Sequence, residues 1–312
     1  MKIIFFGTSQ FAAKVLSYLL NQSHSIEAIV TRPDRAQGRS LKTSSPPVKL
    51  MAQNLHFSSP IYQPEKASTP DFAQILSNHK ADLFVVVAFG EIIKENLLSI
   101  PPQGCINIHA SLLPKYRGAA PMQRCLMNGE SESGVTIIEM VLKMDAGDML
   151  EAMKIPIPEE MTFGELEERL CALSCAALTK VLHDIENGLV KKIPQNEALA
   201  TYAPKISPEE EQIHWDRPAS NIHNLVRALS PSPGAWCYVK IGDDQKRLKI
   251  KHSLVIPHLS GKPGTILNFG KEGWIVACGE QALKLLEVQL EGKKTLKSED
   301  FIKGMHQSLT FA

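Results

Sequence analysis

Three polar side chains within residues 104–148 have types and a spacing that suit catalysis at a carbonyl group. Asn107 and His109 lie two apart in a short apolar stretch that starts at Cys105, so their side chains share one face of the expected strand. Asp145 follows later in a turn of the form D-x-G-D. An amide can donate a hydrogen bond to an oxygen that gains charge, and an imidazole can exchange protons near neutral pH. A carboxylate can orient and stabilise that imidazole.

The segment from Ser111 to Pro121, SLLPKYRGAAP, strengthens this interpretation. A lone N-x-H pair, or a lone Asp before Gly, is a weak signal because most such residues are structural. This segment contains too many Pro and Gly residues to continue the strand that ends at His109, so a shaped loop is predicted beside the imidazole. Pro121 suits the first turn of a helix that runs to about Asn128 and ends at Gly129.

The combination of N-I-H, SLLPKYRGAAP and the D-x-G-D turn closely resembles the catalytic core of the folate-dependent formyltransferases. The resemblance extends from Ile3 nearly to the C-terminus. It implies 10-formyltetrahydrofolate as the formyl donor, no metal, and the amine of methionine on initiator Met-tRNA as the acceptor. It also places the pterin against a loop at 88–92 and against the residues that follow His109. The folate contacts predicted in this way are Phe89, Gly90, Glu91, Ile92, Ser111, Leu112, Leu113 and Pro114.

The resemblance gives each member of the triad, which is Asn107, His109 and Asp145, a role in formyl transfer. Asn107 is expected to bind the formyl oxygen. His109, as an imidazolium held by Asp145, is expected to stabilise the tetrahedral oxyanion and to take part in proton transfer. An α-amino group with a pKa of roughly 7.7–8.0 needs little base strength, so proximity supplies much of the acceleration.

Residues 1–109 alternate apolar strand patterns with helix patterns, which predicts a Rossmann-like, doubly wound α/β domain. The stretch from Asp82 to Phe89, DLFVVVAF, is a continuous β-branched run typical of a central parallel strand. Ligands of such sheets bind beyond the carboxyl ends of the strands, where Phe89 and His109 both lie. The turn at Gly7 has one of the three glycines of the G-x-G-x-x-G fingerprint, which disfavours a dinucleotide-dependent dehydrogenase.

A chain of 312 residues predicts two domains. We expect a catalytic, folate-binding domain over residues 1–189, a linker over 190–207, and a C-terminal domain over 208–312. The C-terminal region has one helix pattern and then short strand patterns punctuated by Gly and Pro, which predicts a small, OB-fold-like β-barrel. Residues 205–312 carry 15 Lys and Arg against 12 Asp and Glu, a balance that permits nucleic-acid binding. We interpret the C-terminal domain as the tRNA-binding domain.

A basic loop over residues 32–49, RPDRAQGRSLKTSSPPVK, also suits RNA. Its glycine and its SSPP run argue against regular structure. Five cations with interspersed hydroxyl groups suit a phosphate backbone, and a solvated surface loop is the alternative. By resemblance, Arg39 and Lys42 reach the acceptor end of the tRNA. In the C-terminal region the alternation in K-I-K puts Lys249 and Lys251 on one face, and we predict them as further tRNA contacts.

The composition, 44% hydrophobic and 21% charged, is typical of a chain that folds around an apolar core. No apolar run approaches the ~20 residues needed to cross a bilayer, and the start, MKIIFFG, is broken too early for a signal peptide. The six cysteines lie mostly in apolar runs, as core thiols do, and they lack the spacing of zinc ligands. We therefore expect a cytoplasmic monomer that needs neither a membrane nor a metal.

Three other functions are compatible with the same residues. A triad of this kind could formylate another amine, such as that of a glycinamide ribonucleotide or a sugar nucleotide. A hydrolase of formyltetrahydrofolate would use water as the acceptor and would need no nucleic-acid-binding tail. A non-catalytic RNA-binding protein could carry a vestigial folate site. The basic loop and the barrel-like tail favour tRNA as substrate, and the complete triad favours an enzyme.

Overall fold

The computed structural model describes residues 1–37, 42–270, 273–305 and 309–311, and its contacts divide the chain into two compact units. The first unit comprises Met1–Pro121, Ser133–Ile155 and Glu167–Ala203. The second comprises Met122–Glu132, Pro156–Leu166 and Pro204–Ala312. Each unit therefore contains segments from more than one part of the sequence.

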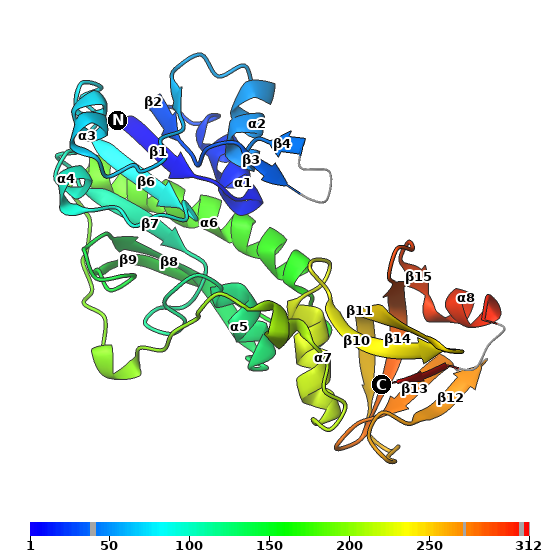
Figure 1. Cartoon of the computed structure of the whole chain (residues 1–312). Helices are drawn as coiled ribbons and strands as arrows, with labels where there is room; N and C mark the ends of the chain where they lie inside the picture. The colour runs from blue at the N-terminus through cyan, green and yellow to red at the C-terminus, as the bar shows by residue number, and fades with distance from the viewer. Residues whose placement is uncertain (38–41, 271–272, 306–308, 312) are drawn as a thin grey trace. The chain divides into compact units, whose positions relative to one another are not determined.

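The first unit contains a sheet in which the strands have the order β5-β2-β1-β6-β7-β8-β9. The pairs from β5 to β7 are parallel, and β8 is antiparallel to β7. The chain leaves β1 in one direction and returns beyond it to β6, so the order reverses between β1 and β6, as in a doubly wound fold. Figure 1 shows β1, β6 and β7 side by side. The strands are β1 (Lys2–Gly7), β2 (Ser25–Val30), β5 (Ile61–Tyr62), β6 (Leu83–Val87), β7 (Cys105–His109), β8 (Glu132–Glu139) and β9 (Met149–Pro156).

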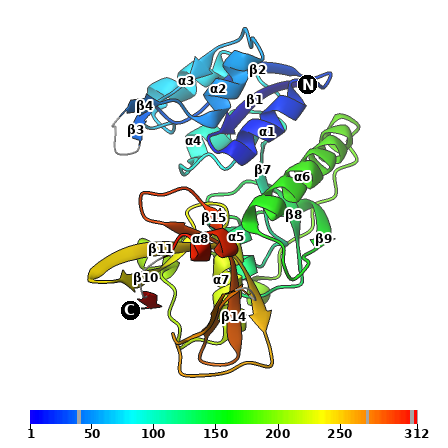
Figure 2. The same ribbon diagram turned by 90° about the vertical axis from the view of Figure 1, so that its right-hand side faces the viewer.

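Local sequence signals explain where several helices of the first 190 residues begin, although most of α5 and the start of α6 fall in the second unit. Ser9 caps α1 by accepting a hydrogen bond from the N–H of Ala12, and Thr69 does the same for α3. Pro stands in the first turn of both α2 and α3, where its missing N–H costs nothing. Figure 2 shows α1 and α2 side by side. The helices are α1 (Gln10–Leu19), α2 (Pro47–Asn54), α3 (Pro70–Ser77), α4 (Glu95–Leu98), α5 (Pro121–Met127) and α6 (Phe163–Glu186).

Strand β6 is buried along its whole length, as its β-branched sequence predicts. Phe84 of this strand packs against Phe6 of β1, with ring centroids 5.2 Å apart, and Phe89 packs edge-on against the same ring. Burial of these rings on adjacent strands fixes the carboxyl ends of β1 and β6. The Rossmann-like, doubly wound fold predicted from the sequence is confirmed.

The basic loop contains a short hairpin, so the prediction that residues 32–49 lack regular structure is wrong. Strand β3 (Arg35–Gln37) pairs antiparallel with β4 (Lys42–Ser44). Both strands are short and polar. They lack the alternation of apolar and polar residues from which a strand is predicted. Residues 38–41, between the two strands, lie outside the described part of the chain.

The second unit carries an antiparallel sheet with the order β12-β13-β14-β11-β10-β16, and β15 pairs with β14. The sheet curves into a nearly closed barrel, as predicted. Trp274 lies in its core and stacks on Phe301 at 5.4 Å between ring centroids. The elements are α7 (Ala219–Ala228), β10 (Ala235–Ile241), β11 (Asp244–Ile256), β12 (Ile266–Gly270), β13 (Gly273–Ala277), β14 (Ala282–Leu290), β15 (Leu296–Lys297), α8 (Ser298–Lys303) and β16 (Leu309–Phe311).

Residues 193–203, which the sequence assigns to a linker, pair with the rest of the first unit. Ile193 bridges Met149, and Tyr202 bridges Arg117. A short 3₁₀ helix, Glu197–Leu199, lies between these two contacts. A second one, Pro208–Glu211, follows in the second unit.

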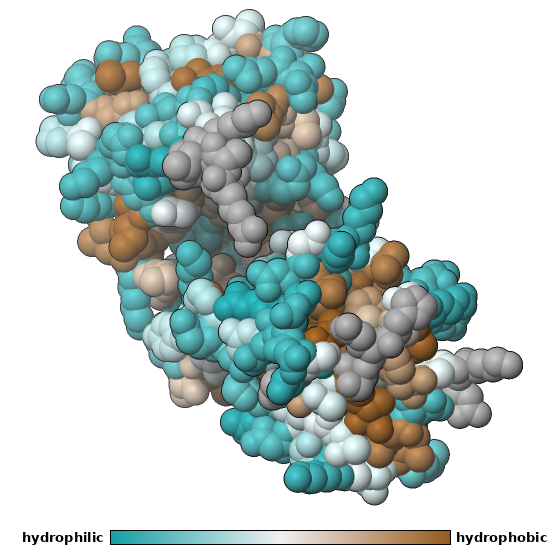
Figure 3. All heavy atoms as spheres, turned by 45° about the vertical axis from the view of Figure 1, so that its right-hand side comes forward, coloured by the Kyte–Doolittle hydropathy of each residue, from teal (hydrophilic) through white to brown (hydrophobic). Residues whose placement is uncertain are grey.

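The face of the molecule drawn in Figure 3 is mainly hydrophilic, with apolar areas in brown. Within the described residues, no helix is both long enough and apolar enough to span a bilayer. Some exposed apolar side chains lie on loops of the first unit, including Ile92 after β6 and Leu142 and Met144 after β8.

Candidate active site

Strand β7 brings Asn107 and His109 to the carboxyl end of the sheet. Its neighbours are β6, where Val86 lies opposite Asn107, and β8, where Thr136 lies opposite His109. The imidazole of His109 is almost fully buried, whereas Asn107 is half-buried. Because the two residues are separated by one position in a strand, their side chains lie on the same face.

A tight turn between β8 and β9 carries Asp145. Its backbone has φ of +50°, the left-handed region that most side chains avoid. Two residues later, a Cβ on Gly147 would lie 1.7 Å from the carbonyl oxygen of Glu139, so only glycine fits there. The D-x-G-D sequence thus describes a turn that folds closely against the end of β8.

The structure brings the three side chains of the triad together. Asn107 Nδ2 donates a hydrogen bond to Asp145 Oδ1 at 3.3 Å. Asp145 Oδ2 accepts from the N–H of Gly118 at 2.8 Å and lies 3.7 Å from His109 Nδ1. The carboxylate therefore contacts the amide and faces the imidazole, and its own side chain is only 13% exposed.

The second nitrogen of His109 is held by the loop that follows it. His109 Nε2 lies 2.8 Å from the carbonyl oxygen of Tyr116. A carbonyl oxygen only accepts, so Nε2 carries a hydrogen and donates it. Nδ1 is then the nitrogen that gains or loses a proton, and it faces Asp145. This arrangement suits an imidazolium, which would have an acceptor opposite each N–H.

Hydrogen bonds within the Ser111–Pro121 loop and from β8 give the loop its shape. Ser111 Oγ donates to the carbonyl of Lys115 at 2.7 Å. Thr136 Oγ1 donates to the carbonyl of Ser111 and accepts from the N–H of Leu113. Tyr116, at the bend, has φ of +62° and is buried. The density of Pro and Gly in the sequence predicted a shaped loop. Its contacts to the triad are made by backbone groups, so the side chains of the loop gave no means of predicting them.

Two family models cover nearly the whole chain. The model described as "Formyl transferase" matches residues 1–182, and the one described as "Formyl transferase, C-terminal domain" matches residues 205–306. The methionyl-tRNA formyltransferase of Protochlamydia amoebophila is 53% identical over 308 residues, which cover 99% of this chain and 96% of that protein. The methionyl-tRNA formyltransferase of Moorella thermoacetica is 42% identical over 305 residues, 97% of this chain and 96% of that protein.

The chain belongs to the methionyl-tRNA formyltransferase family. Solved structures resemble it in fold. HypX from Aquifex aeolicus in complex with tetrahydrofolic acid has a TM-score of 0.65 at 19% identity, covering 98% of this chain and 48% of HypX. This chain thus spans about half the length of HypX. An N-formyltransferase from Helicobacter canadensis in complex with folinic acid and dTDP-3-aminofucose has a TM-score of 0.64 at 20% identity, covering 91% and 98%.

The predicted folate loop after β6 combines fixed and open positions. Phe89 is buried in the core, and Glu91 is held by Arg32 at 2.5 Å and by the N–H of Ala67. Gly90 has φ of +81° and has no atom within 4 Å of the place where a Cβ would lie. Ile92 is 70% exposed. Open backbone and an exposed apolar side chain suit a planar ring better than a charged group.

The other predicted folate residues lie in the first half of the Ser111–Pro121 loop. Ser111 and Leu113 are buried, and the carbonyl of Ser111 and the N–H of Leu113 are both bound by the side chain of Thr136 in β8. Leu112 and Pro114 are half-buried. In this chain the loop therefore has two parts, a buried support and a partly exposed edge.

The cations of the basic loop have different surroundings. Arg39 lies outside the described residues, and for Lys42 the structure gives only a backbone position at the start of β4. Other cations of this loop are paired with carboxylates: Arg32 with Glu91, Arg35 with Glu65, and Lys49 with Asp34. Hydrogen bonds from Gln63 and Lys49 hold the pKa of Asp34 below its usual value. The loop is thus less uniformly cationic than its sequence indicates.

Lys249 and Lys251 bind carbonyl groups of the Pro-rich turn before β10. Lys249 Nζ donates to Pro233 at 2.8 Å, and Lys251 Nζ donates to Pro231 at 2.7 Å. Lys251 is buried, and this burial lowers the pKa of its ammonium. The prediction that Lys251 offers a free charge to RNA does not fit this position, because the alternation in a strand indicates a face but not its exposure.

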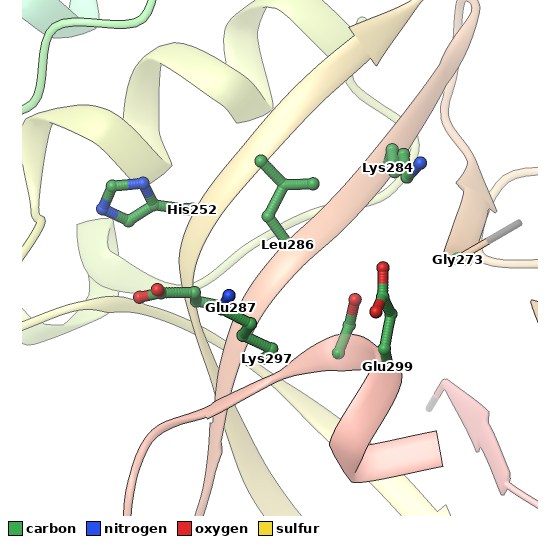
Figure 4. A pocket seen from close by; sticks show the side chains of 8 residues that line it. His252, Gly273, Lys284, Leu286, Glu287, Lys297 and Glu299 are labelled. Carbon is green, nitrogen blue, oxygen red and sulfur yellow. The ribbon is translucent and has the colours of Figure 1, made fainter. Parts of the chain in front are cut away.

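A hollow of about 290 Å³ lies on the barrel of the second unit. Figure 4 shows side chains of both charges around it. Cations and carboxylates are mixed, so the hollow does not have the single sign that a phosphate site needs. It is lined by His252, Gly273, Lys284, Leu286, Glu287, Lys297, Ser298 and Glu299.

The thiol of Cys105 lies close in sequence to the triad but is not a candidate nucleophile. Burial raises the pKa of Cys105, which precedes Asn107 by two residues, to about 12. It is therefore a protonated core thiol at neutral pH. Within the described residues, no group of three or more His, Cys, Asp or Glu side chains is placed to hold a metal ion.

Proposed function

We propose that this chain transfers the formyl group of 10-formyltetrahydrofolate to the α-amino group of methionine on initiator Met-tRNA, which yields formyl-Met-tRNA for translation initiation. The observation that supports the proposal is the position of the Asp145 carboxylate. It accepts hydrogen bonds from Asn107 and Gly118 and faces His109. Near-full-length identity with curated methionyl-tRNA formyltransferases supports the choice of acceptor.

Asn107 acts on the formyl oxygen. One hydrogen of its Nδ2 group goes to Asp145 Oδ1, so the amide cannot turn freely. The second hydrogen remains to be donated to the carbonyl oxygen of the formyl group. Attack of the amine nitrogen places negative charge on this oxygen, and a donor fixed in advance stabilises that charge without reorganising.

His109 and Asp145 take part in the transfer of a proton from the amine to N10 of the folate. In the reaction, a C–N bond forms between the methionine amine and the formyl carbon, and the bond from that carbon to N10 of the folate breaks. The amine loses a proton and N10 gains one. His109 Nδ1 is the nitrogen free to take up a proton, and Asp145 stabilises the resulting imidazolium.

The folate binds at the two loops beyond the carboxyl ends of β6 and β7. Open backbone at Gly90 and exposed Ile92 face the ring from one loop, and Leu112 and Pro114 contribute from the other. Four other residues of these loops are buried in the core or held by hydrogen bonds, and they support the loops: Phe89, Glu91, Ser111 and Leu113.

The tRNA contacts are Arg39 and Lys42 in the basic loop and Lys249 in the C-terminal domain. We take the catalytic domain as residues 1–189, the linker as 190–207 and the tRNA-binding domain as 208–312. The enzyme works as a monomer in the cytoplasm, where its acceptor tRNA is charged.

Formyl transfer from 10-formyltetrahydrofolate to charged Met-tRNA tests the function directly. Free methionine, a glycinamide ribonucleotide and an amino-sugar nucleotide serve as competing acceptors, and release of formate measures hydrolysis. We expect transfer to Met-tRNA to exceed every other reaction. Preferred transfer to a small amine, or formate release without transfer, would contradict the proposal. Binding of Met-tRNA without any turnover would indicate a non-catalytic RNA-binding protein.

The basic-loop contacts are tested by their salt dependence. Arg39→Ala and Lys42→Ala should each weaken use of Met-tRNA and make its salt dependence shallower by about 0.7–0.9 for each lost phosphate contact. Arg35→Ala is the matched control, because Arg35 is already paired with Glu65. Equal, small losses in all three variants with an unchanged salt slope would show that this loop does not contact the tRNA.

A further inference from the structure

Residues 193–203, which we call the strap, run along the two loops that carry the triad. At one end, Ile193 exchanges backbone hydrogen bonds with Met149, just after the Asp145 turn. At the other end, the N–H of Ala203 donates to the carbonyl of Arg117 at 2.7 Å. The strap is thus tied to the backbone beyond Asp145 and to the loop beyond His109.

Gln195 of the strap binds the turn that carries Asp145. Its Nε2 group donates to the carbonyl of Asp145 at 2.8 Å and to the carbonyl of Gly147 at 2.7 Å. One amide therefore holds two peptide groups of this turn, Asp145–Ala146 and Gly147–Asp148. These bonds lie on the backbone of Asp145, while its carboxylate points to Asn107, Gly118 and His109.

The orientation of Gln195 is fixed by Arg117. Arg117 donates to Gln195 Oε1 from Nη2 at 2.7 Å and from Nε at 3.1 Å. Its side chain is fully buried, and it also binds both carboxylate oxygens of Glu197. With its oxygen bound to a guanidinium, the Gln195 amide has only its NH₂ group to present to the turn.

Thr201 of the strap reaches the other half of the triad. Its Oγ1 accepts a hydrogen bond from the N–H of Tyr116 at 2.9 Å. Tyr116 has φ of +62° and uses its carbonyl to hold His109 Nε2. Thr201 thus holds both peptides that flank Tyr116: its side chain, 85 residues away in sequence, binds the Tyr116 N–H, and its backbone carbonyl accepts from the N–H of Arg117 at 2.9 Å.

We infer that Gln195 and Thr201 are positioning residues for formyl transfer: Gln195, locked by Arg117, sets the place of Asp145, and Thr201 sets the place of His109. This inference rests on the proposed function, because turnover is what it changes. A displacement of the reacting groups by ~1 Å can cost 10²-fold in rate. The strap touches the backbone of the triad loops, so its loss should reduce kcat and leave substrate KM values nearly unchanged.

Two variants of Gln195 remove its bonds to the turn, and the first of them also keeps acceptors for Arg117. Gln195→Glu keeps two oxygen acceptors for Arg117 but has no hydrogen to give to Asp145 and Gly147. Gln195→Met keeps the length of the side chain and removes all these bonds. Asn196→Ala is the matched control, since Asn196 binds only the N–H of Ala198 within the strap itself.

A second pair of variants tests the His109 half independently. Thr201→Val keeps the shape of the side chain and removes the acceptor for Tyr116, and Thr201→Ser restores that acceptor. We expect kcat to fall 10- to 100-fold in Gln195→Glu, Gln195→Met and Thr201→Val. KM for folate and for Met-tRNA should stay within about threefold, and Thr201→Ser and Asn196→Ala should keep wild-type kcat.

The full-length chain is assayed for formyl transfer to Met-tRNA, and thermal unfolding is measured for every variant. The inference is wrong if the folded Gln195 and Thr201 variants keep kcat within twofold. It is also wrong if Asn196→Ala loses as much, if KM rises in place of a fall in kcat, or if every variant of Gln195 and Thr201 unfolds. A wild-type chain that does not formylate Met-tRNA would instead refute the proposed function.

Discussion

Replacement of Asp145 by Asn tests the carboxylate at the centre of the triad while its backbone stays in place. Asn adopts the left-handed conformation, here φ of +50°, with less strain than most residues. Its side chain has nearly the same shape, and its one oxygen can still accept from either Gly118 or Asn107. The negative charge that faces His109 is lost, and an NH₂ group then opposes the remaining donor.

The size of the effect follows from the 3.7 Å between His109 Nδ1 and Asp145 Oδ2. At an effective dielectric constant of about 20, unit charges at this distance attract by about 4.5 kcal/mol. Each ~1.4 kcal/mol of barrier is a factor of ten in rate. The amide oxygen retains part of the attraction through its dipole. We therefore expect kcat to fall roughly 10²- to 10³-fold.

The assay is steady-state formyl transfer at saturating 10-formyltetrahydrofolate and Met-tRNA, with thermal unfolding as the test of folding. Asp148→Asn is the matched control, because it removes the same charge from the same turn. The backbone carbonyl of Asp148, and not its carboxylate, accepts the hydrogen bond from Glu139. A kcat for Asp145→Asn within threefold of wild type, or equal losses in both variants, would refute the assigned role.

Three further predictions concern the same region. Asn107→Ala should lower kcat about 10²-fold with little change in either KM, because it removes the donor to the formyl oxygen; steady-state kinetics measure both. Gly147→Ala should lower the melting temperature by several degrees, since its Cβ would lie 1.7 Å from the Glu139 oxygen; unchanged thermal unfolding would contradict this. The Arg117 guanidinium is the main cause that lowers the pKa of Glu197 from 4.5 to about 2. The ionised Glu197 carboxylate therefore stabilises the folded chain above pH 4.5, and this stabilisation is lost as the pH falls towards 2. Glu197→Gln should accordingly make the melting temperature depend less on pH in this acid range, as thermal unfolding at several pH values would show.

Local signals in the sequence predicted the two main sheets, although not the β3–β4 hairpin or the pairing of residues 193–203. The apolar run of β6, the caps at Ser9 and Thr69, and the Pro and Gly punctuation of the second unit each depend on neighbouring residues. The pairing of Asn107 with His109 follows from the period of a strand, and Asp145 is signalled by its turn. Such features are readable because their physical cause lies within a few positions of the residues themselves.

The contacts that set the precision of the site could not be predicted in the same way. Gln195 binds a turn some 50 residues before it, and Thr201 binds a peptide 85 residues before it. The composition of 190–207, with its prolines and lysines, is that of a connecting segment. Lys251 shows the same limit, because its sequence pattern gives a cation on a strand face, whereas its burial depends on how the Pro-rich turn folds over it.

The triad is built on backbone that would not hold its shape alone. Asp145 and Tyr116 both have φ near +55°, which costs roughly 1–2 kcal/mol for a residue other than glycine. Such conformations persist where surrounding contacts over-determine them. Here those contacts are hydrogen bonds from Gln195 to the turn and from Tyr116 to Thr201, and neither involves the sheet. The sheet thus fixes Asn107 and the strand position of His109, while the strap fixes the two strained loops that complete the triad. A substitution in the strap should therefore reduce turnover at a smaller cost in stability than one in the core of β6.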